Sequence, residues 1–422
     1  MSASENPNHV QVSDLSNTGN SSLTIMDLKD DCLLEIFENL NLWQLLNIRQ
    51  LCQRFSDLTD RFRYKYATFT AKIRNDDKFI SIIKYVGPCL KDVHLYKFDN
   101  GDVLEAMLKF CPNLENLTLY DVHLFTRDKI MKLKSVVRNL KHLCLWNCKF
   151  NDDLGECFKG ASSLESLNVR SNHVRITKKF FRNISSLKRL SIRSCVYYSQ
   201  FAQVLINNPM LEVFHTEIIY DGILNDLVRH APGVKELELT FFSRGPCPSI
   251  SCLSDLPNLK SLAIHGYRGQ EVNLLLDNLS TKNIIEELTL GYDCQPNMEA
   301  IIKLTNLKKL KLYGDELKDV VRLPDLQKEK ELLNLINSLK KLKKINLRRT
   351  NVTFEFVKNL IKMLKQQAES RSKLEVKVSF VFFEDCLPEY EASVFMKDCE
   401  DKLKMLLAEN KQVLEFRYYE CR

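Results

Sequence analysis

A repeated pattern of leucines constrains the fold of this chain more than any other feature of its sequence. The segments LKHLCLWNC from Leu140, LESLNVRSN from Leu164 and LKRLSIRSC from Leu187 each read L-x-x-L-x-L-x-x-N/C, with Val169 or Ile192 in place of the third leucine. Weaker copies begin at Leu90, Leu114, Leu211, Val234, Leu259, Ile285, Leu307 and Leu342. Ten steps separate the eleven copies, and nine of them are 22 to 26 residues long. A fixed period of this length indicates a repeat architecture.

Each copy predicts one short strand, because the alternation L-x-L buries one face of an extended segment. Successive parallel strands then stack about 4.8 Å apart into a curved sheet. The helical stretches between them, such as 103–114 and 201–211, form the convex side. Prolines that stop these helices recur just before the strands: Pro112, Pro209, Pro232 and Pro257. At the ninth place Asn172 can satisfy turn backbone groups, and Cys148 and Cys195 can serve as small buried residues.

The array resembles a leucine-rich-repeat solenoid, an α/β fold with a parallel sheet on its concave face and helices on its convex face. The resemblance covers roughly residues 70–385, as about 11–12 repeats. The long last step predicts an extra amphipathic helix around Gln327 to Leu339, and a degenerate copy follows near Leu374. Residues 386–422 predict a helix and then a strand, which suits a C-terminal cap. Residues 1–22 are poor in large apolar side chains, so we expect a disordered tail.

Composition narrows the possible functions. The net charge of +7 over 422 residues is too small to indicate nucleic-acid binding by itself. The polar N-terminus contains no secretory signal, and no apolar run is long enough to span a membrane. We therefore expect the 14 cysteines to be reduced thiols, in the cytoplasm, the nucleus or both. No metal-ligand spacing and no catalytic motif is present, so we expect no metal, no cofactor and no enzymatic activity.

Residues 28–58 do not fit the repeat and predict two or three short amphipathic helices. The first carries Leu33, Leu34, Ile36, Phe37 and Leu40, with Asp30 or Asp31 as its N-cap. The chain restarts at Asn41, and the second group carries Leu45, Leu46, Ile48, Leu51, Cys52, Phe55 and Leu58. So short a segment cannot bury all of these side chains on itself. The remainder must pack against the first repeat or against another protein.

The segment LKDDCLLEIFENLNLWQLLNIRQLCQRFSDL resembles an F-box, the motif by which substrate receptors dock on the Skp adaptor of cullin-based ubiquitin ligases. Lys29 and Phe55 stand where that family usually has Pro and Trp. The F-box is expected to cover residues 23–69. The resemblance implies an adaptor-binding set made of Leu28, Leu33, Ile36, Phe37, Leu40, Leu45, Leu51, Cys52 and Phe55.

The seventh place of each repeat points out of the concave face, because side chains alternate along a strand. Over the first five repeats it reads Tyr96, Tyr120, Trp146, Arg170 and Arg193. Tyr, Trp and Arg are common interface anchors, so we expect these five residues to contact a protein substrate. The alternative is an incidental mix of exposed residues. The basic run Lys340 to Arg349 has two interpretations. Its side chains are either simply solvated, or they form a site for an acidic protein or RNA.

An F-box followed by leucine-rich repeats implies a non-catalytic substrate receptor. The F-box would bind the Skp adaptor and through it a cullin, and the concave sheet would hold a protein substrate for ubiquitination and proteasomal degradation. The alternative is a scaffold that binds adaptor or target without driving degradation. The sequence does not identify the substrate.

Overall fold

A computed structural model describes 24–72, 76–97, 101–124, 126–150, 152–170, 181–193, 201–218, 222–241, 248–268, 270–291, 294, 296–313, 326–347, 354–367, 373–380, 408–409 and 414–420. Contacts between Cα atoms divide the chain into two compact units, Met1–Ala67 and Thr68–Arg422. Each unit is described by itself. The tail predicted for residues 1–22, together with Asn172 and Cys195, lies outside the described residues.

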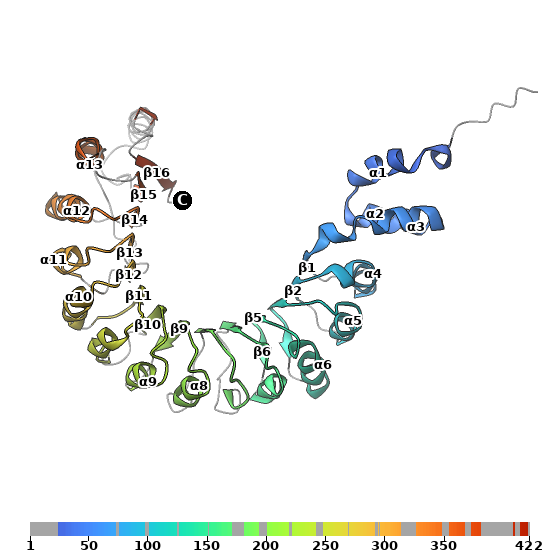
Figure 1. Ribbon diagram of the computed structural model, residues 1–422, viewed down its shortest axis with the longest axis horizontal. Coiled ribbons are helices and arrows are strands. Elements are labelled where there is room, and N and C mark those ends of the chain that lie inside the picture. The colour runs from blue at the N-terminus through green and yellow to red at the C-terminus, as the bar shows by residue number, and fades with distance from the viewer. Residues whose placement is uncertain are drawn as a thin grey trace, which may run out of the picture. The chain divides into compact units, whose positions relative to one another are not determined.

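The first unit is helical (Figure 1, blue). Its elements are η1 (Ile25–Asp27), α1 (Asp30–Glu38), α2 (Leu42–Arg49), α3 (Gln53–Asp60) and η2 (Arg63–Tyr66). Asn41 caps α2 through a capping box with Gln44, as a chain restart there requires. The N-cap of α1 is Lys29, so our expectation of Asp30 or Asp31 was wrong. Both aspartates lie in the first turn instead, where the helix dipole favours a negative charge.

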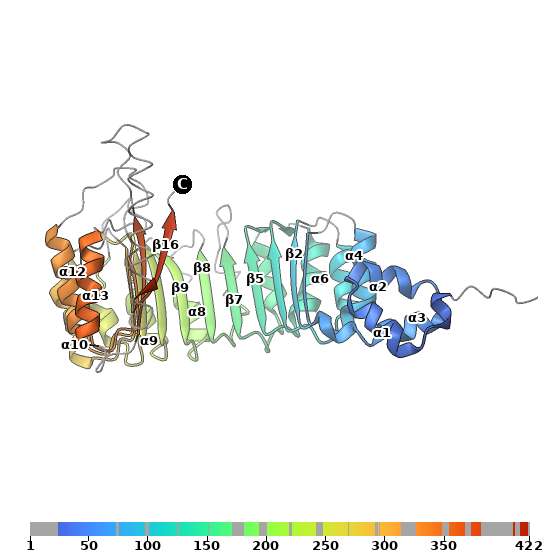
Figure 2. The same ribbon diagram turned by 90° about the horizontal axis from the view of Figure 1, so that it is seen from above.

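The second unit contains a sheet of 14 strands in which every neighbouring pair is parallel (Figures 1 and 2). The strands follow chain order: β1 (Thr68–Lys72), β2 (Asp92–Tyr96), β3 (Asn116–Tyr120), β5 (His142–Trp146), β7 (Ser166–Arg170), β8 (Arg189–Arg193), β9 (Val213–Ile218), β10 (Glu236–Phe241), β11 (Ser261–His265), β12 (Glu287–Gly291), β13 (Lys309–Tyr313), β14 (Lys344–Leu347), β15 (Leu374–Phe380) and β16 (Leu414–Glu420).

Helices cover one face of this sheet and leave the other open (Figure 1). The described helices of this unit are α4 (Asp76–Val86), η3 (Gly87–Cys89), α5 (Asp102–Phe110), α6 (Arg127–Val137), η4 (Asp152–Phe158), α8 (Phe201–Asn207), α9 (Ile223–His230), η6 (Ser251–Asp255), α10 (Glu271–Lys282), α11 (Met298–Ile302), α12 (Leu326–Ser338) and α13 (Phe354–Gln366). Four of them end two residues before the four prolines named above, which confirms the role of these prolines as helix stops. The predicted insertion helix is α12, shifted by one residue.

The strands alternate in burial as the leucine pattern predicts. In β2, β3 and β7 the second and fourth residues are buried and the other three are partly exposed. The buried positions, such as Leu95, Leu119 and Leu145, form the core between sheet and helices. The chain therefore folds as a helical F-box-like unit and a leucine-rich-repeat solenoid.

Three elements were missed or left incomplete by the sequence pattern. Strand β1 precedes the first recognised copy and pairs with β2, although its segment TFTAK contains no leucine. Strand β16 is the strand expected in the C-terminal cap, and it joins the main sheet by pairing with β15. A second, two-stranded sheet joins β4 (His123–Leu124) to β6 (Lys149–Phe150). Most of the predicted cap helix lies outside the described residues.

Polar groups also link neighbouring repeats. The buried side chain of Asn208 accepts a hydrogen bond from the Leu187 amide at 2.8 Å and donates to the carbonyls of Ile184 and Val204 at 3.1 and 2.8 Å. The thiol of Cys148 is fully buried and donates to the Leu119 carbonyl at 3.3 Å. This confirms the prediction that Cys148 serves as a small buried residue at the ninth place. Burial raises the pKa of Cys148 to about 12.

The second position of each repeat carries a charged ladder. It reads Lys91, Glu115, Lys141, Glu165, Lys188, Glu212 and Lys235 over the first seven repeats. Three neighbouring pairs are joined by ion pairs of 2.8 to 3.0 Å: Lys141–Glu115, Lys188–Glu165 and Lys235–Glu212. A fourth pair, Lys308–Glu286 at 2.7 Å, repeats the arrangement farther along the sheet. These pairs cross from one repeat to the next and favour correct stacking.

Candidate functional site

The first unit has a hydrophobic core of its own. Leu33, Phe37, Leu45 and Phe55 are at most 2% exposed and pack together with Leu58 and Phe62. The rings of Phe37 and Phe55 meet edge to face, with centroids 5.3 Å apart. Four of the nine predicted adaptor-binding residues are therefore core residues of this module. The expectation that they present their side chains to a partner is corrected by their burial in the free chain.

Two further members of the predicted set, Leu40 and Cys52, are partly buried and pack against the same core. The thiol of Cys52 accepts a hydrogen bond from the Phe55 amide at the start of α3, at 3.5 Å. Lys29 keeps the extended backbone that proline would have, with φ −66° and ψ 154°. The departures at Lys29 and Phe55 are thus accommodated within the local structure.

The other three predicted residues, Leu28, Ile36 and Leu51, are exposed, Leu51 to 70%. They belong to a larger group of exposed apolar side chains in this unit, which also contains Ile25, Met26 and Trp43. The sequence analysis did not single out these last three residues. These six exposed side chains are the candidate interaction surface of this module.

Arg54 fixes the N-terminal part of this surface. Its guanidinium donates to the carbonyls of Met26 and Leu28, at 2.7 and 2.6 Å, and to the carboxylate of Asp30. The segment before α1 is thereby tied to α3. The role of Arg54 as a clamp depends on contacts across more than 20 residues of sequence, so local sequence reasoning missed it.

The predicted concave column forms as a physical unit. Tyr96, Tyr120, Trp146 and Arg170 occupy the same register on β2, β3, β5 and β7. The two tyrosine rings are stacked, with centroids 4.1 Å apart and planes 2° from parallel. Trp146 lies 6.0 Å from Tyr120, and the guanidinium of Arg170 lies 4.4 Å from the centre of the Trp146 ring. The alignment of these side chains is confirmed, while their contact with a substrate stays a prediction.

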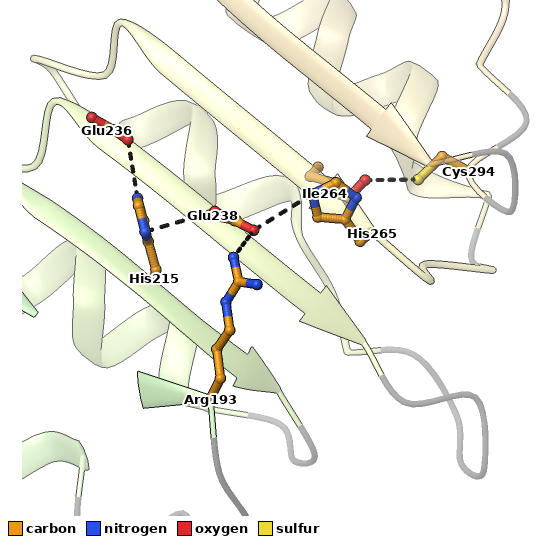
Figure 3. A network of polar contacts seen from close by, with 7 residues as sticks. All are labelled: Arg193, His215, Glu236, Glu238, Ile264, His265 and Cys294. Carbon is orange, nitrogen blue, oxygen red and sulfur yellow. Dashed lines mark hydrogen bonds and ion pairs between the residues drawn. The ribbon is translucent and has the colours of Figure 1, made fainter. Parts of the chain in front are cut away.

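The two arginines of the column differ in their partners. Arg170 and Arg193 are register neighbours on β7 and β8. Arg193 forms an ion pair with Glu238 on β10 (Figure 3). Among the described residues, no carboxylate lies within ion-pair distance of Arg170. Of the two arginines of the column, Arg193 therefore has an internal carboxylate partner.

Glu238 is the centre of a network that sequence reasoning missed (Figure 3). His215 lies 3.1 Å from Glu236 and 3.6 Å from Glu238, and His265 lies 3.7 Å from Glu238. These side chains occupy the fifth and seventh places on β9, β10 and β11, with Glu236 at the third. Reading the polar places column by column, instead of only the seventh, would have found the acidic and histidine-rich centre.

Burial raises the pKa values of several titratable groups near the column. Burial raises the pKa of the Cys144 thiol, at the fifth place of its repeat on β5, to about 11. Burial also raises the pKa of Tyr120, and its contact with the Tyr96 hydroxyl raises it further. Burial raises the pKa of Glu217 on β9, against the opposing charges of Arg193 and Arg170. This face offers stacking and hydrogen bonding, and Cys144 has no reactive thiolate at neutral pH.

The lysine-rich C-terminal repeats are partly neutralised. Lys308 and Lys309 pair with Glu286 and Glu287, and Lys344 pairs with Glu375 at 2.8 Å. Arg348 and Arg349 lie outside the described residues. Within the run itself, the ion pair of Lys344 leaves one fewer cation for a nucleic acid to contact.

Two features are absent from the described residues. No helix in these ranges is long and apolar enough to cross a bilayer. No group of three or more His, Cys, Asp or Glu side chains in them has the geometry of a metal site.

Comparison with known proteins agrees with the two-part architecture. Residues 25–66 match the F-box domain family. The human F-box/LRR-repeat protein 12 is 26% identical over 270 residues, which cover 58% of this chain and 79% of that protein. A leucine-rich-repeat protein of Leptospira interrogans aligns with a TM-score of 0.39 and 15% identity, over 74% of this chain and 82% of its own. The chain therefore contains a match to the F-box domain family at residues 25–66, ahead of a parallel repeat sheet, and it resembles a human F-box/leucine-rich-repeat protein.

Proposed function

We propose that this chain is the substrate-recognition subunit of a Skp–cullin–F-box ubiquitin ligase. The F-box docks the Skp adaptor and through it a cullin, while the concave face of the repeats binds a protein substrate in the cytoplasm, the nucleus or both. The observation that carries the proposal is the F-box itself, which has a complete internal core and still exposes Leu28, Ile36, Trp43 and Leu51.

Such a subunit performs no bond chemistry. It raises the effective concentration of a substrate lysine near the ubiquitin-charged enzyme, which converts an encounter between two molecules into a step within one complex. The bonds between repeats suit this task, because they hold the substrate-binding sheet in one shape.

The adaptor contact is tested by changing exposed residues only. The double variant Ile36→Asp with Leu51→Asp places two charges on the proposed surface without entering the core. Full-length protein carrying it should lose co-purification of the Skp adaptor and the cullin. Met131→Asp is the matched control, because Met131 is equally exposed but lies on helix α6 of the solenoid. Normal adaptor recovery with the double variant, folded by circular dichroism, would reject the F-box assignment.

A second candidate function is a scaffold that binds adaptor and target without degradation. The same F-box and the same concave column support it, so structure does not separate the two. Target half-life after depletion of this protein separates them. A lengthened half-life supports the ligase receptor, and an unchanged half-life with retained binding supports the scaffold.

A further inference from the structure

The column formed by Tyr96, Tyr120, Trp146 and Arg170 is prearranged for a flat ligand group. Its rings and guanidinium are fixed by one another, at the same strand position on four successive strands. The chain leaves the strand immediately afterwards, because Lys97, Asp121 and Asn147 adopt positive φ values of 53° to 54°. Each of these residues donates a backbone hydrogen bond to the column residue of the next strand, so the column stands at a well-defined edge of the sheet.

Arg170 is the residue of this column that favours a negatively charged ligand group. Its guanidinium lies on the Trp146 ring, which removes water from one face and leaves its N–H groups directed around the plane. Stacked guanidinium groups of this kind bind carboxylates through paired hydrogen bonds. Within the described ranges no carboxylate of the chain takes this position, whereas the neighbouring Arg193 is held by Glu238. One anion site is therefore open and the adjacent one is filled.

The surroundings favour a ligand group with a single negative charge. Glu238 offsets the charge of Arg193, and the carboxyl of Glu217 lies where it interacts with both arginines. A phosphate carries a charge of about −1.5 to −2 at neutral pH and is usually bound by several cations. One open guanidinium beside two carboxyl groups suits the side chain of Asp or Glu better.

We propose that this column binds an extended segment of the protein substrate in which an Asp or Glu lies two residues from an aromatic side chain. The carboxylate would bind Arg170, and the aromatic ring would lie against Trp146 and Tyr120. The partner is the substrate of the proposed receptor, so this inference rests on the proposed function.

The spacing follows from the geometry of strands. Trp146 and Tyr120 lie one and two strands from Arg170, which is about 5 and 10 Å at the usual strand separation. Alternate residues of an extended peptide point the same way and are about 6.6 Å apart. A peptide that runs across the strands thus brings residue i over Arg170 and residue i+2, or i−2, over the rings. Adjacent residues would point to opposite sides.

Four fluorescein-labelled dodecapeptides in a Gly/Ser background test the inference by fluorescence polarisation with the full-length chain. They contain Glu-Ser-Phe, Gln-Ser-Phe, Glu-Phe-Ser and phosphoserine-Ser-Phe. The Glu-Ser-Phe peptide should bind about tenfold more tightly than the Gln-Ser-Phe and Glu-Phe-Ser peptides, as one charge-assisted contact or one aligned ring allows. The Glu-Ser-Phe peptide should also bind more tightly than the phosphoserine peptide. Tighter binding of the phosphoserine peptide would overturn the choice of carboxylate, and equal binding of all four would overturn the site.

Two variants locate the binding. Arg170→Gln should remove the preference for Glu over Gln, and Trp146→Leu should remove the preference for Phe at the second following position. The control is Arg189→Gln on β8, an exposed arginine at the third place of its repeat and outside the column. It should leave both preferences unchanged. Preferences that persist in Arg170→Gln would place the peptide elsewhere.

Adaptor co-purification with the same preparations separates this inference from the proposed function. If the unsubstituted chain shows no peptide selectivity but binds the adaptor normally, the column is rejected and the receptor role still stands. Peptide binding by a chain that recovers no adaptor would support the column and reject the ligase role. If the Glu-Ser-Phe peptide shows no binding at millimolar protein, the inference is wrong.

Discussion

Arg54 and Asp30, which are 24 residues apart, are joined by hydrogen bonds of 2.9 and 2.7 Å from the guanidinium Nε and Nη2 to one carboxylate oxygen. The same guanidinium binds the carbonyls of Met26 and Leu28. One side chain therefore holds the segment that carries three exposed apolar residues, Ile25, Met26 and Leu28, against helix α3.

Replacing Arg54 by Met should weaken adaptor binding without unfolding the F-box. The variant keeps the aliphatic stem but loses the bonds that position Met26 and Leu28, so we expect an affinity about tenfold lower, as for the loss of one or two charge-assisted bonds. Surface plasmon resonance with the Skp adaptor measures it. Arg61→Met is the control, because Arg61 is exposed on the same module. Equal affinities of both variants would contradict the clamp.

Phe37→Ala should destabilise the F-box by about 3–5 kcal/mol, because it leaves a cavity in a fully buried core. Hydrogen exchange should rise throughout residues 24–67 while strands of the solenoid keep their protection, since contacts divide the chain after Ala67. Ile36→Ala, an exposed change on the same helix, should leave exchange unaltered. Protected amides in Phe37→Ala would show that this core contributes little.

Asn208→Leu should lower the stability of the solenoid. The change leaves the buried amide of Leu187 and the carbonyls of Ile184 and Val204 without their side-chain partner, at about 1–3 kcal/mol for each unsatisfied group. Urea unfolding of the full-length chain measures the loss. Asn207→Leu serves as the comparison, because Asn207 hydrogen-bonds only Gln203 among the described residues. Similar midpoints for the two variants would refute a structural role for Asn208.

Cysteine reactivity should follow burial. Burial raises the pKa values of Cys111, Cys148 and Cys157 to about 12, so almost no thiolate exists at pH 7.5. Among the cysteines that the structure describes, Cys32 is exposed on α1 and should react with iodoacetamide first. Peptide mass spectrometry at increasing times should detect the three buried thiols only after denaturation. Early modification of any of them in folded protein would contradict this order.

The charged ladder should make stability depend on pH. Hydrogen bonds from Lys141, Lys235 and Lys308 lower the pKa values of Glu115, Glu212 and Glu286. Groups with lowered folded pKa values stabilise the protein above their ordinary value near 4.5, and this contribution is lost as pH falls through the folded values. The triple variant Glu115→Gln, Glu212→Gln, Glu286→Gln should therefore show a smaller drop in melting temperature from pH 6.5 to pH 4.

High salt is the internal control for this experiment. The ladder carboxylates are exposed, so 1 M NaCl should reduce the difference between wild type and triple variant. An identical pH dependence of the two proteins at low salt would show that the ladder does not contribute.

The periodic part of the fold was predictable from the sequence, because each L-x-L segment buries alternate side chains. Strand β1 was not, since Phe69 and Ala71 occupy the places of the second and third leucines and no copy precedes it. The alternating charges of the ladder can also be found in the sequence, at the second place of the repeat. The leucine pattern does not reveal them, because it aligns only the apolar places.

The site was predictable in part. The register of the repeats placed Tyr96, Tyr120, Trp146 and Arg170 in one column, as the structure confirms. The internal partner of Arg193 was not foreseeable, because Glu238 lies two strands away at a different place of its repeat. In the F-box, the family pattern identified important residues but did not tell core from surface. That distinction depends on how α1, α2 and α3 pack.

The alternating ladder also encodes the order in which repeats can stack. Within the run from Lys91 to Lys235, residues in neighbouring repeats have opposite charges and residues two repeats apart have the same charge; Lys260 in the next repeat ends the alternation. Looping out a single repeat during folding would set Lys141 beside Lys188, or Glu165 beside Glu212, at about the strand spacing. Like charges at that distance repel. The repeats have similar shapes, so a repeat could stack on the wrong neighbour during folding. Repulsion between like charges of the ladder disfavours that misassembly.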